Sequence, residues 1–281
     1  MADPAPTAPS TSASNLTLRI ASAVVMMPLA LAAAYYGDWP FALFWTLAAI
    51  AILWEWTALV DGRGHHLVFS TCAGAVLVSG ILAYEGRPIT AICLVGLGAL
   101  TAAILSPRAE RAWLSAGVGY AGALLLSALL LRGAEWHGFI ALVLLFAIVW
   151  STDIFGYFAG RTFGGPKLMP SVSPKKTWSG AIAGALGAMI AAVLVASAFG
   201  GLNKTAFAAL AVVLSVLSQS GDLLESSIKR RFGAKDASGL IPGHGGVMDR
   251  LDGFWAAALA ACIIGVWRGG LSDAARGLLI W

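Results

Sequence analysis

The chain has 281 residues, of which 59% are hydrophobic and 11% are charged, and its formal net charge is +4. Soluble domains carry about 25% charged residues, so this apolar excess excludes a single soluble core and requires contact with lipid. A nucleic-acid-binding protein is also excluded, because no basic face on a soluble domain can be found in the sequence.

The first residues, 1–16, are rich in Pro, Ala, Ser and Thr and lack the basic start of a signal peptide. We therefore expect a disordered cytoplasmic tail there. Apolar segments long enough to cross a hydrocarbon core of about 30 Å then recur along the chain. They lie near 18–36, 39–60, 67–84, 88–106, 112–131, 138–159, 178–199, 205–223 and 253–268. We predict an all-α, polytopic integral membrane protein of about nine transmembrane helices, with N-terminal helices in 17–136 and a catalytic region in 137–281.

Lysine and arginine are unequally divided between the two sides that this topology defines. Thirteen fall on the side of the N-terminus and five on the opposite side. Because positive charges mark cytoplasmic loops, we expect the N-terminus and the loops 160–177 and 224–252 to be cytoplasmic and the C-terminus to be external. The expected location is the cell's inner (plasma) membrane, with the active site facing the cytoplasm.

A few acidic residues fall inside or at the end of apolar segments, namely Glu55, Asp153 and the pair Asp222 and Glu225. A carboxylate at the centre of a membrane helix costs about 2.5–3.5 kcal/mol on insertion scales. Glu55 either reaches the lipid headgroups from a helix end or has a structural or site role. Asp153 shares a helix face with Tyr157 and Gly160 and has Arg161 beside it. Two interpretations of Asp153 follow: it forms an ion pair with Arg161, or it belongs to an active site.

The loop that follows, SVSPKKTWSG (171–180), places two lysines just before an apolar helix. Positive charge at a cytoplasmic helix end explains one or two lysines by itself. Pro174 ends any earlier helix, so Lys175 and Lys176 would lie near a new helix N-terminus, where anions bind readily. We therefore also expect these lysines to bind phosphate.

The most polar part of the chain follows the eighth apolar segment. Continued helix would place Asp222, Glu225, Ser226 and Lys229 on one face, at positions i, i+3, i+4 and i+7. A helix that begins near residue 248 would bring Asp249 and Asp252 to one face as well. Two acidic faces with a basic loop between them suggest a metal ion facing phosphate, and Mg²⁺ commonly combines carboxylates with substrate phosphates.

The loop between these two helices contains the glycine-rich sequence PGHGG (242–246). Glycines allow backbone N–H groups to approach an anion closely, here just before a helix N-terminus. His244 could donate a hydrogen bond to a phosphate. The loop is therefore expected to take part in binding a phosphorylated substrate.

This stretch resembles the signature of the phosphatidate cytidylyltransferases, or CDP-diacylglycerol synthases. The matching positions include Ser226, Lys229, Arg230, Lys235, Asp236, His244, Gly245, Gly246, Asp249, Arg250 and Asp252. The segments around Asp153 and SPKKTW are similar to further blocks of that family, and so is the pair Glu55–Trp56. Ser179 departs from the family, in which Glu or Gln often follows that tryptophan, so no role is carried to it.

The resemblance implies transfer of the cytidylyl group of CTP to phosphatidic acid, which gives CDP-diacylglycerol and pyrophosphate. It implies a homodimer in the lipid bilayer and Mg²⁺ as the cofactor, with a second cation also considered. Asp222 and Asp249 are the expected metal ligands, and Asp153, Glu225 and Asp252 are further candidates. The expected catalytic and substrate-binding residues are Asp153, Lys175, Lys176, Asp222, Ser226, Lys229, Arg230, Lys235, Asp236, His244, Asp249 and Arg250.

Two other functions are compatible with parts of this pattern. A CTP-dependent kinase of a lipid alcohol would share the topology and the basic loops, although the full 226–252 pattern argues against it. An ion or anion transporter could use Asp153 and Asp222 as intramembrane ion sites. Inverted repeats would favour a transporter, and the two halves of the sequence show none.

Overall fold

The computed structural model describes residues 12–61, 66–133, 135–241, 243 and 245–281. The elements in chain order are α1 (Ser12–Tyr36), α2 (Asp38–Asp61), α3 (His66–Tyr84), α4 (Pro88–Leu105), α5 (Arg111–Arg132), α6 (Trp136–Phe163), β1 (Lys167–Met169), β2 (Ser173–Thr177), α7 (Trp178–Phe199), α8 (Lys204–Arg231), α9 (Met248–Gly269) and α10 (Ala274–Leu279).

The helices α2 to α9 are each long and apolar enough to span a bilayer, and α1 contributes a shorter apolar segment, Val24–Tyr36, among the described side chains. The prediction of an all-α, multi-pass membrane protein is thereby confirmed. Around the polar stretch, the continued helix and the helix start near residue 248 that the sequence suggested are both present, because α8 continues to Arg231 and α9 begins at Met248. Helix α1 begins at Ser12, inside the expected disordered tail, whose residues 1–11 lie outside the described part.

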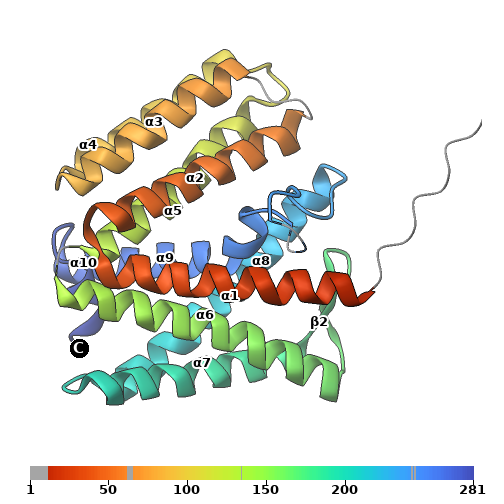
Figure 1. The fold of residues 1–281 in the computed structure, drawn as a ribbon, viewed down its shortest axis with the longest axis vertical. Helices are drawn as coiled ribbons and strands as arrows, with labels where there is room; N and C mark the ends of the chain where they lie inside the picture. The colour runs from red at the N-terminus through yellow and green to blue at the C-terminus, as the bar shows by residue number, and fades with distance from the viewer. Residues whose placement is uncertain (1–11, 62–65, 134, 242, 244) are drawn as a thin grey trace, which may run out of the picture.

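The helices form a bundle in which the α3–α4 hairpin lies at one edge and the α6–α7 pair at the other (Figure 1). Helices α2 and α5 lie next to the α3–α4 hairpin, and α9 contacts both α5 and α8. The β-hairpin and the loop after α8 lie at the same end of the bundle, whereas the C-terminus lies at the opposite end (Figure 1). The fold therefore gathers the two polar loops on one side, as the alternating topology requires.

Small residues allow the helices around these loops to pack closely. A Cβ atom on Gly180 of α7 would lie 2.7 Å from the carbonyl oxygen of Gly156 in α6. A Cβ atom on Gly221 of α8 would lie 2.7 Å from the carbonyl oxygen of Asp252 in α9. Close backbone approach through small residues is a common way to pack helices in lipid. It brings Asp222 of α8 next to the first turns of α9.

The buried side of the bundle is joined by stacked aromatic rings. Trp45 of α2 stacks on Phe254 of α9 at a centroid distance of 4.9 Å, and Phe254 stacks on Phe146 of α6 at 5.3 Å. Trp45 and Phe254 are almost fully buried. These contacts hold the N-terminal helices against the C-terminal ones, so both predicted regions share one core.

Arg132, at the end of α5, is buried and satisfies backbone carbonyl groups at the end of α1. Its Nε donates to the Ala34 carbonyl oxygen at 2.6 Å, and its Nη2 donates to that of Tyr35 at 3.2 Å. The last carbonyl groups of a helix have no partner within the helix and carry partial negative charge, so a guanidinium stabilises them. Arg132 thus fixes α1 to the bundle from the end opposite the β-hairpin.

The antiparallel β-hairpin was not predicted from the sequence. Lys167 pairs with Thr177 and Met169 with Ser173. A strand of three residues is too short to show an alternating pattern. The hairpin carries Lys175 and Lys176 in β2, and Thr177 caps α7 by accepting a hydrogen bond from the Gly180 amide at 3.1 Å. The two lysines therefore precede a helix N-terminus, as expected, but from a strand.

Candidate active site

A cavity of about 550 Å³ lies where α6, α7 and α8 meet the β-hairpin. It contains Asp153 and Asp222 together with the basic residues Arg161, Lys167, Lys175 and Lys176. Tyr157 and Gln219 add polar groups, and Gly156, Gly160 and Gly180 complete the lining where α6 and α7 pack closely. Basic groups with carboxylates at a membrane helix end suit a site that binds a phosphate-bearing ligand with a cation.

Lys176 forms an ion pair with Asp222 across this cavity. The other oxygen of Asp222 accepts a hydrogen bond from the Ser226 hydroxyl at 3.3 Å, one turn further along α8. Both side chains of the ion pair are 28% exposed. Ion pairs that remain accessible to water contribute little to stability, so this pair is able to open when an anionic ligand enters.

Asp153 faces several charges from other elements. It lies within electrostatic range of Asp222 in α8, Lys176 in β2 and Arg250 in α9. The Arg161 guanidinium instead donates to the Tyr157 hydroxyl at 2.9 Å. The alternative in which Asp153 forms an ion pair with Arg161 is therefore wrong, because Arg161 is turned toward Tyr157 on its own helix.

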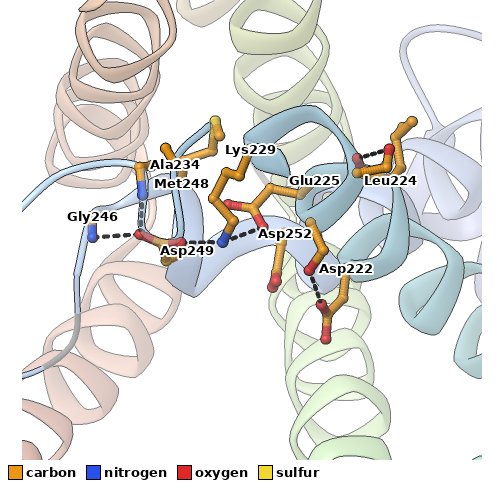
Figure 2. A network of polar contacts seen from close by, with 12 residues as sticks. Asp222, Leu224, Glu225, Lys229, Ala234, Gly246, Met248, Asp249 and Asp252 are labelled. Atoms are coloured by element: carbon orange, nitrogen blue, oxygen red, sulfur yellow. Dashed lines mark hydrogen bonds and ion pairs between the residues drawn. The ribbon is translucent and has the colours of Figure 1, made fainter. Parts of the chain in front are cut away.

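Deeper in the protein, Lys229 lies between two acidic residues (Figure 2). Its Nζ is 2.7 Å from Oε2 of Glu225 and also forms an ion pair with Oδ1 of Asp249. The side chain of Lys229 is 9% exposed, that of Asp249 4% and that of Glu225 0%. We expected Lys229 to contact substrate phosphates, but in this structure its charge is held between α8 and α9, outside the cavity lining.

The start of α9 is held by the carboxylates of Asp249 and Glu55. Oδ2 of Asp249 accepts from the backbone amides of Ala237 at 2.8 Å and Gly246 at 2.7 Å. Glu55 of α2 accepts from the next two amides, those of Val247 at 2.8 Å and Met248 at 2.7 Å. Of the glycine-rich sequence 242–246, the Gly246 amide is thus taken by Asp249, and the expectation that this loop binds a phosphorylated substrate stays a prediction.

The other predicted residues that the structure describes lie at the end of α8, in the loop after it, or in the first turn of α9. Arg230 donates to the Ala234 carbonyl oxygen at 2.9 Å, just after the end of α8. Lys235, Asp236 and Arg250 are exposed. His244 lies outside the described residues, so its predicted role stays a prediction.

The sequence interpretation missed several residues of the cavity. Lys167 belongs to the unexpected hairpin, and Gln219 lies one turn before Asp222. Gln219 donates to the Ala181 carbonyl oxygen at 3.3 Å and thereby joins α8 to α7. Its amide in an otherwise apolar segment was the signal that could have identified it.

The donor set suits Mg²⁺ bound together with a phosphate ligand. Among the residues that the structure describes, no three His, Cys, Asp or Glu side chains are arranged to hold a metal by themselves. Asp222 and Asp252 point to the same side of the buried network in Figure 2, and their charges act on each other. Mg²⁺ needs only one or two carboxylates when substrate phosphates complete its shell. Asp222 fits this role, whereas Asp249 already contacts Lys229 and two amides.

Comparison with known proteins agrees with this site. Residues 17–266 match the model of the cytidylyltransferase family. The chain belongs to the cytidylyltransferase family. The match covers α6, α7, α8 and the β-hairpin, which line the cavity, and also α2, which supplies Glu55.

Curated relatives within this family resemble the chain over most of its length. A phosphatidate cytidylyltransferase of Brucella abortus is 44% identical over 255 residues, which cover 90% of this chain and 94% of the relative. A protein of the same name from Haemophilus influenzae is 34% identical, and the match covers 86% of this chain and 96% of that relative. One from Rickettsia bellii is 31% identical, and the match covers 85% of this chain and 86% of that relative. The family resemblance seen in the sequence is thereby confirmed.

Proposed function

We propose that this chain is an integral membrane nucleotidyltransferase that joins the cytidylyl group of CTP to phosphatidic acid. The products are CDP-diacylglycerol and pyrophosphate. The observation that carries the proposal is the cavity at the end of α6 and α8, in which four basic side chains surround Asp153 and Asp222. Family membership and the relatives' names support the same activity.

The reaction needs positioning and charge neutralisation more than an activated nucleophile. A phosphate oxygen of the lipid is already anionic and attacks the α-phosphorus of CTP, while the bond to the pyrophosphate oxygen breaks. Lys167, Lys175 and Lys176 supply positive charge to the phosphates, and Lys176 becomes available when it leaves Asp222. Preorganised charges of this kind stabilise the charge that develops in the transition state. The acyl chains remain in the bilayer, so the lipid enters from the side.

The cofactor is proposed to be Mg²⁺, held by Asp222, with Asp249, Asp252 and Asp153 as the other candidate carboxylates. When bound, such an ion polarises the phosphates and offsets repulsion between two polyanions. Asp249 could share the ion only if Lys229 moved from Oδ1. The exposed residues Arg250 and Lys235 are proposed to bind the lipid or nucleotide phosphates. The resemblance implies the same role for Arg230, Ser226, Asp236 and His244.

Purified protein in detergent or nanodiscs tests the function directly. Incubation with phosphatidic acid, Mg²⁺ and CTP labelled at the α-phosphate should give a labelled lipid and free pyrophosphate. Label at the γ-phosphate should stay out of the lipid, because only a kinase transfers that group. A lipid labelled from γ-labelled CTP, or no labelled lipid at all with active substrate controls, would overturn the proposal.

Replacing both Lys175 and Lys176 by glutamine should raise the KM for CTP without preventing insertion. Each lost charge-assisted contact costs about 1.5–3 kcal/mol, or roughly a 10- to 150-fold weaker interaction. The matched control is Lys204→Gln, an exposed lysine at the other end of α8. Steady-state kinetics of the inserted proteins decide whether the lysines bind phosphate or serve only the membrane topology. Unchanged KM values in the double variant would leave them only a role in topology.

The proposed orientation places the cavity on the cytoplasmic side of the inner membrane. The charge division of 13 to five supports it, and a homodimer in this membrane is proposed from the resemblance. A cysteine introduced at Ala234, after α8, should be protected from a membrane-impermeant thiol reagent in intact cells, and one at Ser272 should react. Cys93 is exposed in the fold, so the background variant carries Cys93→Ser. The reverse labelling pattern would contradict both the orientation and access of CTP to the site.

A further inference from the structure

Glu55 is a fully buried carboxylate near the end of α2, at 0% exposure. Its Oε1 accepts hydrogen bonds from the Ser238 hydroxyl at 2.6 Å and from the Val247 amide at 2.8 Å. Its Oε2 accepts from the Met248 amide at 2.7 Å. A buried charge is stable only when such partners replace water, so Glu55 is committed to the loop between α8 and α9.

These contacts make Glu55 the N-terminal cap of α9, supplied by a different helix. Val247 is the residue that precedes α9, and its own side chain forms no capping hydrogen bond. The first amides of a helix lack partners within the helix and attract negative charge, so a carboxylate there is stabilising. Gly246 leaves the space that Glu55 needs, since a Cβ atom at that position would lie 2.4 Å from Oε1 of Glu55.

The neighbouring residue, Trp56, fixes the end of α2 in place. Its indole N–H donates to the Trp113 carbonyl oxygen at 2.8 Å, at the start of α5. Its ring packs against Gly117, where a Cβ atom would lie 2.4 Å from the ring. Glu55 is therefore an acceptor held at a fixed position, to which Ser238, Val247 and Met248 of the signature stretch are hydrogen-bonded.

The amides that Glu55 holds directly precede the polar residues of α9. Gly246 donates to Asp249, whereas Val247 and Met248 donate to Glu55, so the two carboxylates divide three successive amides. A shift of Val247 and Met248 would move Asp249 and Arg250, because they lie in the same first turn. Because Asp249 is an ion-pair partner of Lys229, the same shift would disturb the contact between α8 and α9.

We propose that Glu55 is a positioning residue for the transfer reaction. It sets the start of α9 so that Asp249 and Arg250 are correctly placed relative to α8 and the cavity. This inference rests on the proposed function of those residues. It assigns the N-terminal helices a part in catalysis, although the signature residues lie on the C-terminal helices.

The test compares Glu55→Gln, Glu55→Asp and Ser238→Ala with the control Glu85→Gln. Glu85 is exposed near the end of α3, at the opposite end of the bundle. A glutamine side chain can accept hydrogen bonds only through its oxygen and not through its NH₂ group. We therefore expect the kcat of Glu55→Gln to fall about 10- to 100-fold, because small misplacements of reacting groups have effects of this size. The KM for CTP should change less, because the lysines of the cavity are untouched. Asp keeps the charge and should retain more activity than Gln.

A second measurement reports the proposed movement without any turnover. Hydrogen–deuterium exchange should become faster in the segment 237–252 of Glu55→Gln, and of Ser238→Ala to a smaller extent, while the α6–α7 segments keep their protection. If Glu55→Gln does not insert, Glu55→Asp and Ser238→Ala carry the test, each with a lower kcat and faster local exchange. A wild-type kcat in the inserted variants, or a kcat loss with unchanged exchange in 237–252, would overturn the inference.

The variant Asp249→Asn separates this inference from the proposed function. If Asp249→Asn is inactive and the Glu55 variants behave as the wild type, the positioning role fails alone. If Asp249→Asn keeps normal turnover, the role proposed for α9 in the reaction fails, and Glu55 has nothing to position.

Discussion

Replacing Asp222 by asparagine is expected to abolish turnover while the protein still inserts and folds. Asparagine has nearly the same shape, but it removes the negative charge that faces Lys176 and that is proposed to hold Mg²⁺. Loss of one preorganised electrostatic group commonly lowers kcat on the order of 10²–10³-fold, and loss of a metal ligand should be at least as severe. Formation of labelled lipid from CTP and phosphatidic acid is the measurement.

The stability of the Asp222→Asn variant should be close to that of the wild type. Asp222 is 28% exposed in the cavity, so its ion pair with Lys176 contributes little to folding. Asp273→Asn is the matched control, since Asp273 is also partly exposed and paired with a basic residue, but at the opposite end of the bundle. Near-normal activity and Mg²⁺ dependence in Asp222→Asn would show that Asp222 is not a metal ligand.

Asp249→Asn is expected to lose activity and, in contrast, to lose stability as well. Asp249 is 4% exposed at its side chain and holds Lys229 together with two backbone amides. Removing one member of a buried ion pair destabilises a protein by up to about 3–5 kcal/mol, because the other charge remains buried. The thermal unfolding temperature in detergent should therefore fall for Asp249→Asn and stay unchanged for Asp273→Asn.

The double variant Asp222→Asn/Asp249→Asn tests whether the two aspartates act together. If Asp222 and Asp249 act in one reaction, the activity of the double variant should be no lower than that of the less active single variant, because residues that act as a unit are not additive. Its stability should match Asp249→Asn alone. An unaltered unfolding temperature in Asp249→Asn would contradict the buried network, and additive losses of activity would contradict a shared role.

The membrane architecture and the family could be predicted from the sequence. Lipid requires long apolar helices, and a window of about 20 residues reveals each one locally. The motif around Lys229 and Asp249 has fixed spacing and lies on one continuous stretch, so it can be recognised without the tertiary structure. Asp222 and Ser226 were correctly placed on one face for the same reason, because α8 simply continues as a helix.

The partners of these residues could be decided only by the tertiary structure. Glu55 and Met248 are 193 positions apart, and Lys176 and Asp222 come from a hairpin and a helix with another helix between them. Sequence spacing gives helix faces but not which faces meet, and that depends on close packing at residues such as Gly180 and Gly221. A buried charge must find a partner wherever the fold provides one. For that reason Lys229 faces Asp249 and Glu225, and the amides at the start of α9 meet Glu55.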